Sequence, residues 1–310
     1  MIKGKLQQAL LLIVLIGLLL NCPLQAVEWS EEEIEAMAKR AEATVQKAYD
    51  FLWQYRLEFD MADSIWDPKK TGMIGVEHTL LTTTLGNKNA KYLSTQPGWA
   101  AWVVRDLAHR GLWPRADVAI TFSGSFPALN IAVLAALQEL ESDVHGVCSV
   151  GASSWGANCI GLSWPEMERL LREEDILNVG CSAVTLGGSG DRGGEWDDYA
   201  MKLALTAVKR SRLPFLKARN LRDSIKKRMN FYGETADYVC YINVGGNHAS
   251  LGGGPLLRYH RGGWYFEQAG GKGNPNGVMD AFLEDGIPCL NMLMLAELNH
   301  KEKIVESRPR

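Results

Sequence analysis

Apolar residues recur every three or four positions between residues 31 and 57, which is the period of an α-helix with one buried face. Ser30 stands three residues before Glu33, the spacing of a capping box that begins a helix. We therefore expect one long amphipathic helix, which either forms a stalk between a membrane and the domain or packs on the domain itself. Its apolar stripe consists of Ile34, Met37, Ala41, Val45, Ala48 and Leu52.

Short β-branched runs alternate with helical segments from Ala116 onward. This alternation predicts an α/β fold with a doubly wound, mostly parallel sheet, preceded by the N-terminal helix. A helix over 98–110, capped by Ser94 or Thr95, precedes the sheet, and a hairpin over 256–266 and a final helix follow it. The expected strands are 117–122, 144–150, 179–186 and 238–244, and the expected helices between them are 127–140, one capped by Ser163, and 195–211.

The first 26 residues have the pattern of an export segment. Lys3 and Lys5 precede an apolar run over residues 9–20, which suits a signal peptide and is short for a spanning helix. Cleavage after Ala26, lipidation at Cys22 and an uncleaved anchor all remain open. We expect this segment to be followed by the helix within 27–58, an α/β domain over 59–300 and a disordered tail over 301–310.

Composition and charge narrow the function classes. The 310 residues are 46% hydrophobic and 22% charged, with a formal net charge of −3, as in an ordinary globular protein. Without a basic footprint, no nucleic-acid partner is expected. A polyanion would have to be held by local dipoles and a few cations. The cysteine spacings predict no metal site, and a Cys148–Cys159 disulfide is conceivable after export.

Each of the four expected strands ends in a turn rich in glycine and serine. In a parallel sheet these turns gather at the carboxyl edge, where backbone N–H groups and helix N-termini favour anions. Small residues at tight turns are the alternative explanation for any one loop, but four together favour a site. Arg192 adds a planar fork suited to a carboxylate. The expected substrate-binding residues are Gly124, Ser125, Ser153, Ser154, Asn158, Gly188, Ser189, Arg192 and Asn247.

A catalytic interpretation of the same loops is also possible. Ser125, Asp191 and His248 occur in the chain order of the α/β-hydrolase triad, although the G-x-S-x-G elbow is missing around Ser125. Ser125 before Phe126-Pro127 is equally suited to cap a helix. His78, beside Glu77, is the second choice for a base. The sequence has no P-loop or G-x-G-x-x-G context, and no cofactor is expected.

Several segments between residues 60 and 290 resemble the poly-γ-glutamate system protein family. They are Ser64-Ile65-Trp66-Asp67-Pro68, Thr82-Thr83-Thr84-Leu85-Gly86, the stretches 123–130 and 149–158, and Gly188-Ser189-Gly190-Asp191-Arg192-Gly193. The resemblance implies a role in making, trimming or exporting poly-γ-glutamate at the cell envelope, beside membrane-embedded synthesis or export proteins. It carries over no catalytic residue.

Two hypotheses follow from the sequence. The preferred one is an exported or membrane-anchored accessory protein whose loops bind the carboxylates of poly-γ-glutamate or another anionic polymer. The alternative is a γ-glutamyl hydrolase or transferase with a serine nucleophile, which requires Ser125 Oγ within about 3 Å of a His248 nitrogen.

Overall fold

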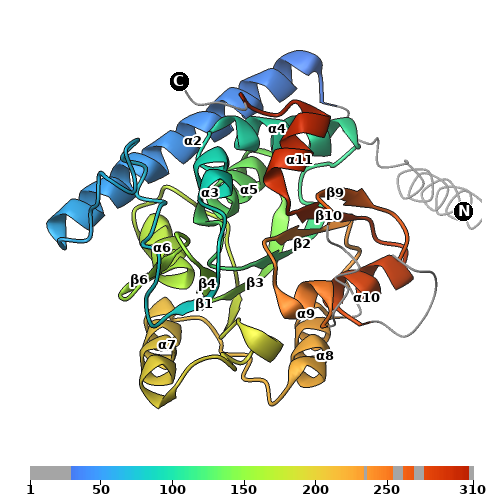
Figure 1. The fold of residues 1–310 in the computed structure, drawn as a ribbon. Helices are drawn as coiled ribbons and strands as arrows, with labels where there is room; N and C mark the ends of the chain where they lie inside the picture. The colour runs from blue at the N-terminus through green and yellow to red at the C-terminus, as the bar shows by residue number, and fades with distance from the viewer. Residues whose placement is uncertain (1–28, 234–235, 254–260, 269–275, 307–310) are drawn as a thin grey trace, which may run out of the picture.

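The computed structural model describes residues 29–233, 236–253, 261–268 and 276–306 (Figure 1). The expected export segment, with its apolar run and Cys22, lies outside these residues. Within the described part of the chain, no helix combines the length and the apolar character needed to cross a membrane.

Six strands form the central sheet, and the expected α/β class is confirmed. Five of them are parallel, and β9 is antiparallel at one edge. The spatial order is β7-β3-β2-β8-β10-β9, so that successive strands are added first on one side of β2 and then on the other. The strands are β2 (Asp117–Phe122), β3 (Asp143–Ser149), β7 (Ala183–Thr185), β8 (Cys240–Val244), β9 (Gly263–Tyr265) and β10 (Cys289–Met292).

Helices cover both faces of this sheet, as the doubly wound arrangement requires. On one face, α4 (Gly98–His109) and α5 (Pro127–Glu139) pack against each other. On the other face, α8 (Leu221–Tyr232), α9 (His248–Leu251) and α10 (Val278–Glu284) pack together around a second apolar cluster that includes Phe282. The remaining helices are α3 (Lys88–Ser94), α6 (Trp164–Glu173), the 3₁₀ turn η1 (Ser189–Asp191), α7 (Asp198–Ser211) and α11 (Leu295–Glu302).

The long N-terminal helix α2 (Glu31–Glu58) matches the expected stripe and capping box. It packs on α4 and α5, across the top of the view in Figure 1. Its stripe is buried, and Glu35 pairs with Arg105 of α4, with 2.8 Å between Oε2 and Nη2. The helix is therefore part of the domain along its length and does not project from it as a stalk.

A short two-stranded sheet fastens the segment before α4 to the main sheet. β1 (Thr82–Thr84) pairs in parallel with β4 (Ala152–Ser153), just after β3. The Asn158 side chain strengthens this link, because its Nδ2 donates to Val76 O at 2.8 Å and to Thr82 Oγ1 at 3.0 Å. A second pair, β5 (Asn158–Cys159) and β6 (Leu162–Ser163), leads into α6. Residues 76–86 are thereby held against the carboxyl edge of the main sheet.

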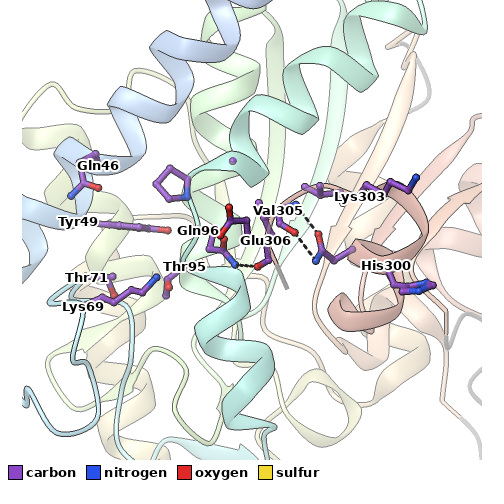
Figure 2. A pocket seen from close by; sticks show the side chains of 14 residues that line it. Gln46, Tyr49, Lys69, Thr71, Thr95, Gln96, His300, Lys303, Val305 and Glu306 are labelled. Carbon is purple, nitrogen blue, oxygen red and sulfur yellow. Dashed lines mark hydrogen bonds between the residues drawn. The ribbon is translucent and has the colours of Figure 1, made fainter. Parts of the chain in front are cut away.

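Several local expectations are wrong. Neither Ser94 nor Thr95 caps α4, whose N-cap is Pro97, and Ser125 does not cap α5, whose N-cap is Phe126 without a side-chain bond. The chain beyond residue 300 is not loose as far as Glu306, since Gln96 Nε2 donates to Glu306 O at 2.8 Å. Figure 2 shows this contact beside a hollow of about 950 Å³ between α2 and the C-terminal segment.

Candidate functional site

The strand order reverses between β2 and β8, which makes the carboxyl ends of these two strands the topological switch point of the sheet. In open α/β sheets, ligands bind in the crevice outside such a point. The loop after β2 contains Gly124 and Ser125, and the loop after β8 contains Gly245, Gly246 and Asn247. The loops after β3 and β7 lie along the same edge, because all four strands are parallel.

Backbone hydrogen bonds connect these four loops to one another. Gly124 N–H donates to Gly151 O at 3.1 Å, and Gly151 N–H donates to Leu186 O at 2.8 Å. On the other side, Ser123 N–H donates to Val244 O at 3.3 Å. The edge is therefore built as one unit, but the N–H groups of Gly124 and Gly151 are used within it and are not available to an anion.

Gly245 is a position that strongly favours glycine. Its φ of +87° lies in the region that L-residues rarely adopt, and a Cβ would stand 2.3 Å from Ser123 Oγ. Gly246, the next residue, is exposed and has no atom within 4 Å of where a Cβ would be. The two glycines differ in this way although they are adjacent, and only the first sets the close approach of the β2 and β8 loops.

The three residues of the expected triad are not assembled. Ser125 Oγ accepts a hydrogen bond from Ser153 N–H at 3.1 Å, and among the described residues no hydrogen bond joins it to His248. His248 is exposed, and its Nδ1 accepts from Gly190 N–H at 3.3 Å. Among the described residues, no hydrogen bond or ion pair joins Asp191 to either of them. The Ser125–Asp191–His248 geometry that the hydrolase hypothesis requires is therefore missing from this structure.

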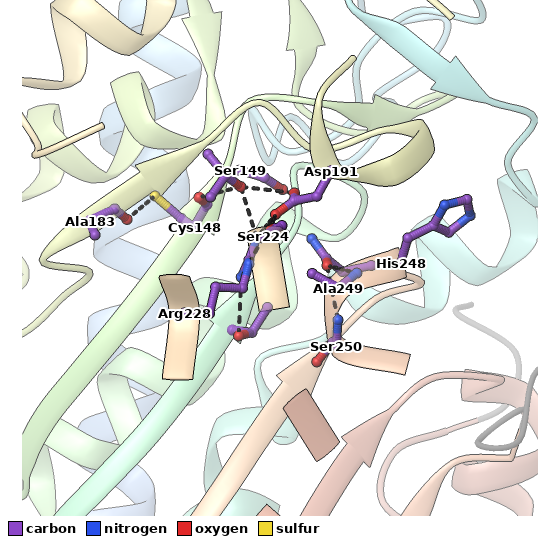
Figure 3. A network of polar contacts seen from close by, with 12 residues as sticks. Cys148, Ser149, Ala183, Asp191, Ser224, Arg228, His248, Ala249 and Ser250 are labelled. Atoms are coloured by element: carbon purple, nitrogen blue, oxygen red, sulfur yellow. Dashed lines mark hydrogen bonds and ion pairs between the residues drawn. The ribbon is translucent and has the colours of Figure 1, made fainter. Parts of the chain in front are cut away.

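Asp191 instead forms a buried ion pair. One carboxylate oxygen, Oδ2, lies 2.8 Å from Arg228 Nη2 and also accepts from Ser224 Oγ, while Oδ1 accepts from Thr185 Oγ1 at 2.9 Å. Figure 3 shows this network on one side and the His248 ring pointing away from it. Burial works against the charge of Arg228, but the nearby carboxylate raises the pKa of the guanidinium overall. Asp191 thus holds η1 against α8, which is a structural role.

Arg192, the next residue, has a different environment. Its side chain is exposed, and it forms no ion pair or side-chain hydrogen bond with any residue that the structure describes. Beside it, Ser189 N–H donates to the carboxylate of Glu195, at 2.7 Å from Oε2. A Cβ on Gly188 would stand 2.7 Å from the same carboxylate. The loop therefore already holds one carboxylate, and next to it lies an arginine without a side-chain partner in the described part of the chain.

Three of the other expected binding residues have internal partners. Asn158 is fully buried in the clamp to Val76 described above. Asn247 caps α9, since its Oδ1 accepts from Ala249 N–H at 2.8 Å. Ser153 Oγ lies 2.8 Å from the Nζ of Lys91. Ser154 is buried, and its Oγ has no hydrogen-bond partner among the described residues. None of these four side chains is free to reach a large ligand from solvent.

Lys91 is the residue of this edge that the sequence does not reveal. It is 1% exposed, lies on α3 and donates to the carbonyl oxygen of Ser125 as well as to Ser153 Oγ. Burial lowers the pKa of its ammonium to about 7. The only sequence signal is a lysine on the inner side of a seven-residue helix, too short for its periodicity to be recognised.

His78 lies near the carboxyl edge, and the two larger hollows lie elsewhere on the molecule. His78 is exposed and lines a hollow of about 400 Å³ together with β1, Glu195 and Trp196. A hollow of about 1010 Å³ at the amino edge of the sheet is lined by aromatic residues, including Trp113, Trp264 and Phe266. Neither this hollow nor the one in Figure 2 contains an expected site residue.

One buried group of potential metal ligands was not expected from the cysteine spacings. A ligand atom of each of Cys148, Glu168 and Cys181 lies within 4.8 Å of the others. Burial raises the pKa of Glu168 to about 7, and its Oε1 accepts from Cys181 N–H at 2.6 Å. Three ligands are one fewer than a closed structural zinc site uses. The conceivable Cys148–Cys159 disulfide is not formed, and both thiols are free.

Comparison of the chain with protein-family models, with curated proteins and with solved structures finds no match in any of the three.

Proposed function

We propose that this protein binds a carboxylate-rich chain, of which poly-γ-glutamate is the favoured candidate, at the carboxyl edge of its sheet. The observation that carries the proposal is the loop after β7. There a backbone N–H group holds the Glu195 carboxylate, and the exposed guanidinium of Arg192 has no partner among the described residues. A planar fork of this kind can bind a second carboxylate through two parallel hydrogen bonds.

The sequence supports the choice of ligand and the place of action. The segments of the glycine loops resemble the poly-γ-glutamate system protein family, and the N-terminal 26 residues have the pattern of an export segment or anchor. We infer an exported or anchored accessory protein of the cell envelope that works beside membrane-embedded synthesis or export proteins. The mildly acidic net charge of −3 means that binding depends on this local site and not on a global field.

The Arg192→Ala variant tests the proposal. Loss of a charge-assisted contact worth about 1.5–3 kcal/mol should weaken binding of a γ-linked glutamate oligomer about ten- to a hundredfold. Ser125→Ala should cost much less, because its hydroxyl is neutral and already accepts from Ser153 N–H. The affinities are measured by isothermal titration calorimetry on the full chain.

Arg115→Ala is the matched control. Arg115 is also exposed but precedes β2, at the opposite edge of the same sheet, where its guanidinium pairs with Asp143 at 3.3 Å. The Arg115→Ala variant should bind the oligomer with the same affinity as the parent protein. Equal affinities for the parent, Arg192→Ala and Arg115→Ala would show that the loop after β7 is not the binding site.

A further inference from the structure

We propose that a second surface of this protein, at the carboxyl-terminal ends of α6 and α7, binds the same polymer chain that the loop after β7 holds. The chemistry of the ligand, a carboxylate-rich chain, rests on the proposed function, and the place is argued from the structure. Five cations gather there and define what we call the basic surface: Arg169, Arg172, Lys209, Arg210 and Arg212.

Two hollows adjoin on the basic surface. Helices α6 and α7 pack against each other, on the left of the view in Figure 1. A hollow of about 310 Å³ lies between α6 and the residues that end α7, and one of about 680 Å³ lies between α6, α7 and the end of α2. Arg169 and Arg212 line both hollows. An extended chain can therefore run through the two hollows past these arginines, whereas a compact ligand would occupy only one.

Positive charge exceeds negative charge among the residues that line these hollows. Five cations face three carboxylates there. One carboxylate, Glu173, accepts from both Arg169 and Arg212. Another, Glu166, has its Oε1 3.5 Å from Nη1 of Arg210. Three of the five cations therefore share only two carboxylates.

The remaining charges leave this excess in place. Burial raises the pKa of the third carboxyl, Glu168, to about 7, so that it is only partly charged at neutral pH. The ends of α6 and α7 together contribute roughly one negative charge. Glu174 and Asp175, which follow α6, line neither hollow. Arg172 and Lys209 form no ion pair or side-chain hydrogen bond with any residue whose position the structure describes. These two cations are available to an anionic ligand.

A large ligand can reach the basic surface from solvent. The side chains of Arg210 and Arg212 are 57% and 75% exposed, and Arg172 and Lys209 are exposed as well. Arg169 lies deeper, with 23% of its side chain exposed. In this respect the surface differs from the carboxyl edge, where Arg192 is exposed but most of the other expected polar side chains are used internally.

A narrow chain fits this surface better than a flat membrane does. Phe59 lines the larger hollow and is exposed, as is Leu57, and a membrane could bury both. However, Glu58 and Asp60 flank Phe59 and are exposed too, so an anionic membrane would be repelled there. An extended chain can follow α6 and α7 without contacting these two carboxylates.

The basic surface lies one helix length from the loop after β7. Helix α7 begins just beyond this loop and ends on the basic surface, and its 14 residues span about 21 Å. A γ-linked glutamate dimer is too short to contact both places, whereas a polymer of about 50 residues can do so. Binding at one place then raises the effective concentration of the chain at the other. The protein should therefore favour long chains over short ones.

Calorimetric titration of the full chain with this dimer and with the polymer tests the proposal. The double variant Lys209→Gln with Arg210→Gln should bind the polymer about tenfold more weakly, because two exposed charge contacts are lost. Its affinity for the dimer should equal that of the parent. Arg192→Ala, in contrast, should weaken binding of both ligands. Failure of the basic surface and failure of the loop after β7 therefore give different results.

The matched control is the double variant Lys39→Gln with Lys47→Gln, which loses the same charge from exposed positions of α2 outside both hollows. It should bind the polymer with the parent affinity. In the parent, the polymer and not the dimer should slow amide exchange in residues 168–173 and 206–212, a result that does not depend on how any variant folds.

Three results would overturn the proposal. The first is parent-like polymer affinity in the Lys209→Gln and Arg210→Gln variant, together with no polymer-dependent protection of residues 206–212. The second is an equal loss of polymer affinity in the α2 control, which would reduce the effect to net charge. The third is a parent protein that binds phosphatidylglycerol vesicles through Lys209 and Arg210 but does not bind the polymer, which would assign the basic surface to a membrane.

Discussion

Replacing Asp191 by alanine is expected to lower the free energy of unfolding by about 3–5 kcal/mol, because it leaves a buried guanidinium without its partner. Both side chains of the Asp191–Arg228 pair are fully buried, with 2.8 Å between Oδ2 and Nη2. Thr185 and Ser224 would each lose an acceptor as well. Urea denaturation followed by circular dichroism measures the change.

The control is Asp198→Ala, which removes an exposed carboxylate from the first turn of α7. It should lower the free energy of unfolding by well under half of the loss expected for Asp191→Ala. A double variant, Asp191→Leu with Arg228→Met, should recover part of the lost stability, since it removes both buried charges together. A catalytic Asp191 would behave differently. Its alanine variant would remain as stable as the parent and lose only activity, and that result would contradict the structural role.

Gly245→Ala is expected to cost about 2–4 kcal/mol of stability, from the strain of a positive φ and from the clash of its new methyl group. The Cβ would stand 2.3 Å from Ser123 Oγ, between the two loops of the switch point. The variant should therefore also lose affinity for a γ-linked oligomer. Thermal unfolding and calorimetric titration measure the two effects.

Gly246→Ala provides a matched comparison one residue along the chain. A Cβ at this position meets no atom within 4 Å, and φ is not positive. It should leave stability unchanged within about 0.5 kcal/mol. If the two alanine variants were equally stable, the close approach of the β2 and β8 loops would not be the reason for glycine at position 245.

The sequence predicts the regular part of the fold well, because hydrophobic patterning determines it. The expected strand 117–122 is observed with the same bounds, and the expected helix 31–57 is observed as Glu31–Glu58. The third strand was expected over 179–186 and is shorter, Ala183–Thr185, because only one neighbour, β3, pairs with it in the main sheet.

Elements with polar or very short buried faces could not be predicted in this way. Helix α8 buries Ser224, Arg228 and Tyr232 most deeply, while its apolar Ile225 and Met229 are only half-buried, so its most buried face is largely polar. Strand β10 has four residues, Cys289–Met292, and no strand was expected there. A short apolar run of this kind does not distinguish a buried strand from a buried helix.

The contents of the candidate site depend on contacts between distant segments. Asp191 and Arg192 are adjacent in the sequence, yet one is buried against Arg228 and the other is exposed. Lys91 reaches Ser153 across 62 positions of the chain. Residue types and order along the chain therefore indicated which loops share the carboxyl edge of the sheet, but not which side chains are free there.

Hydrogen exchange with and without a γ-linked glutamate oligomer tests the central claim most directly. Binding at the carboxyl edge should slow exchange of backbone amides in residues 123–126, 188–194 and 245–248 and leave the amino edge unchanged. Protection confined to residues 107–113 and 264–266, which line the aromatic hollow at the amino edge, would place the ligand elsewhere. That result, or no protection at a saturating oligomer concentration, would contradict the account.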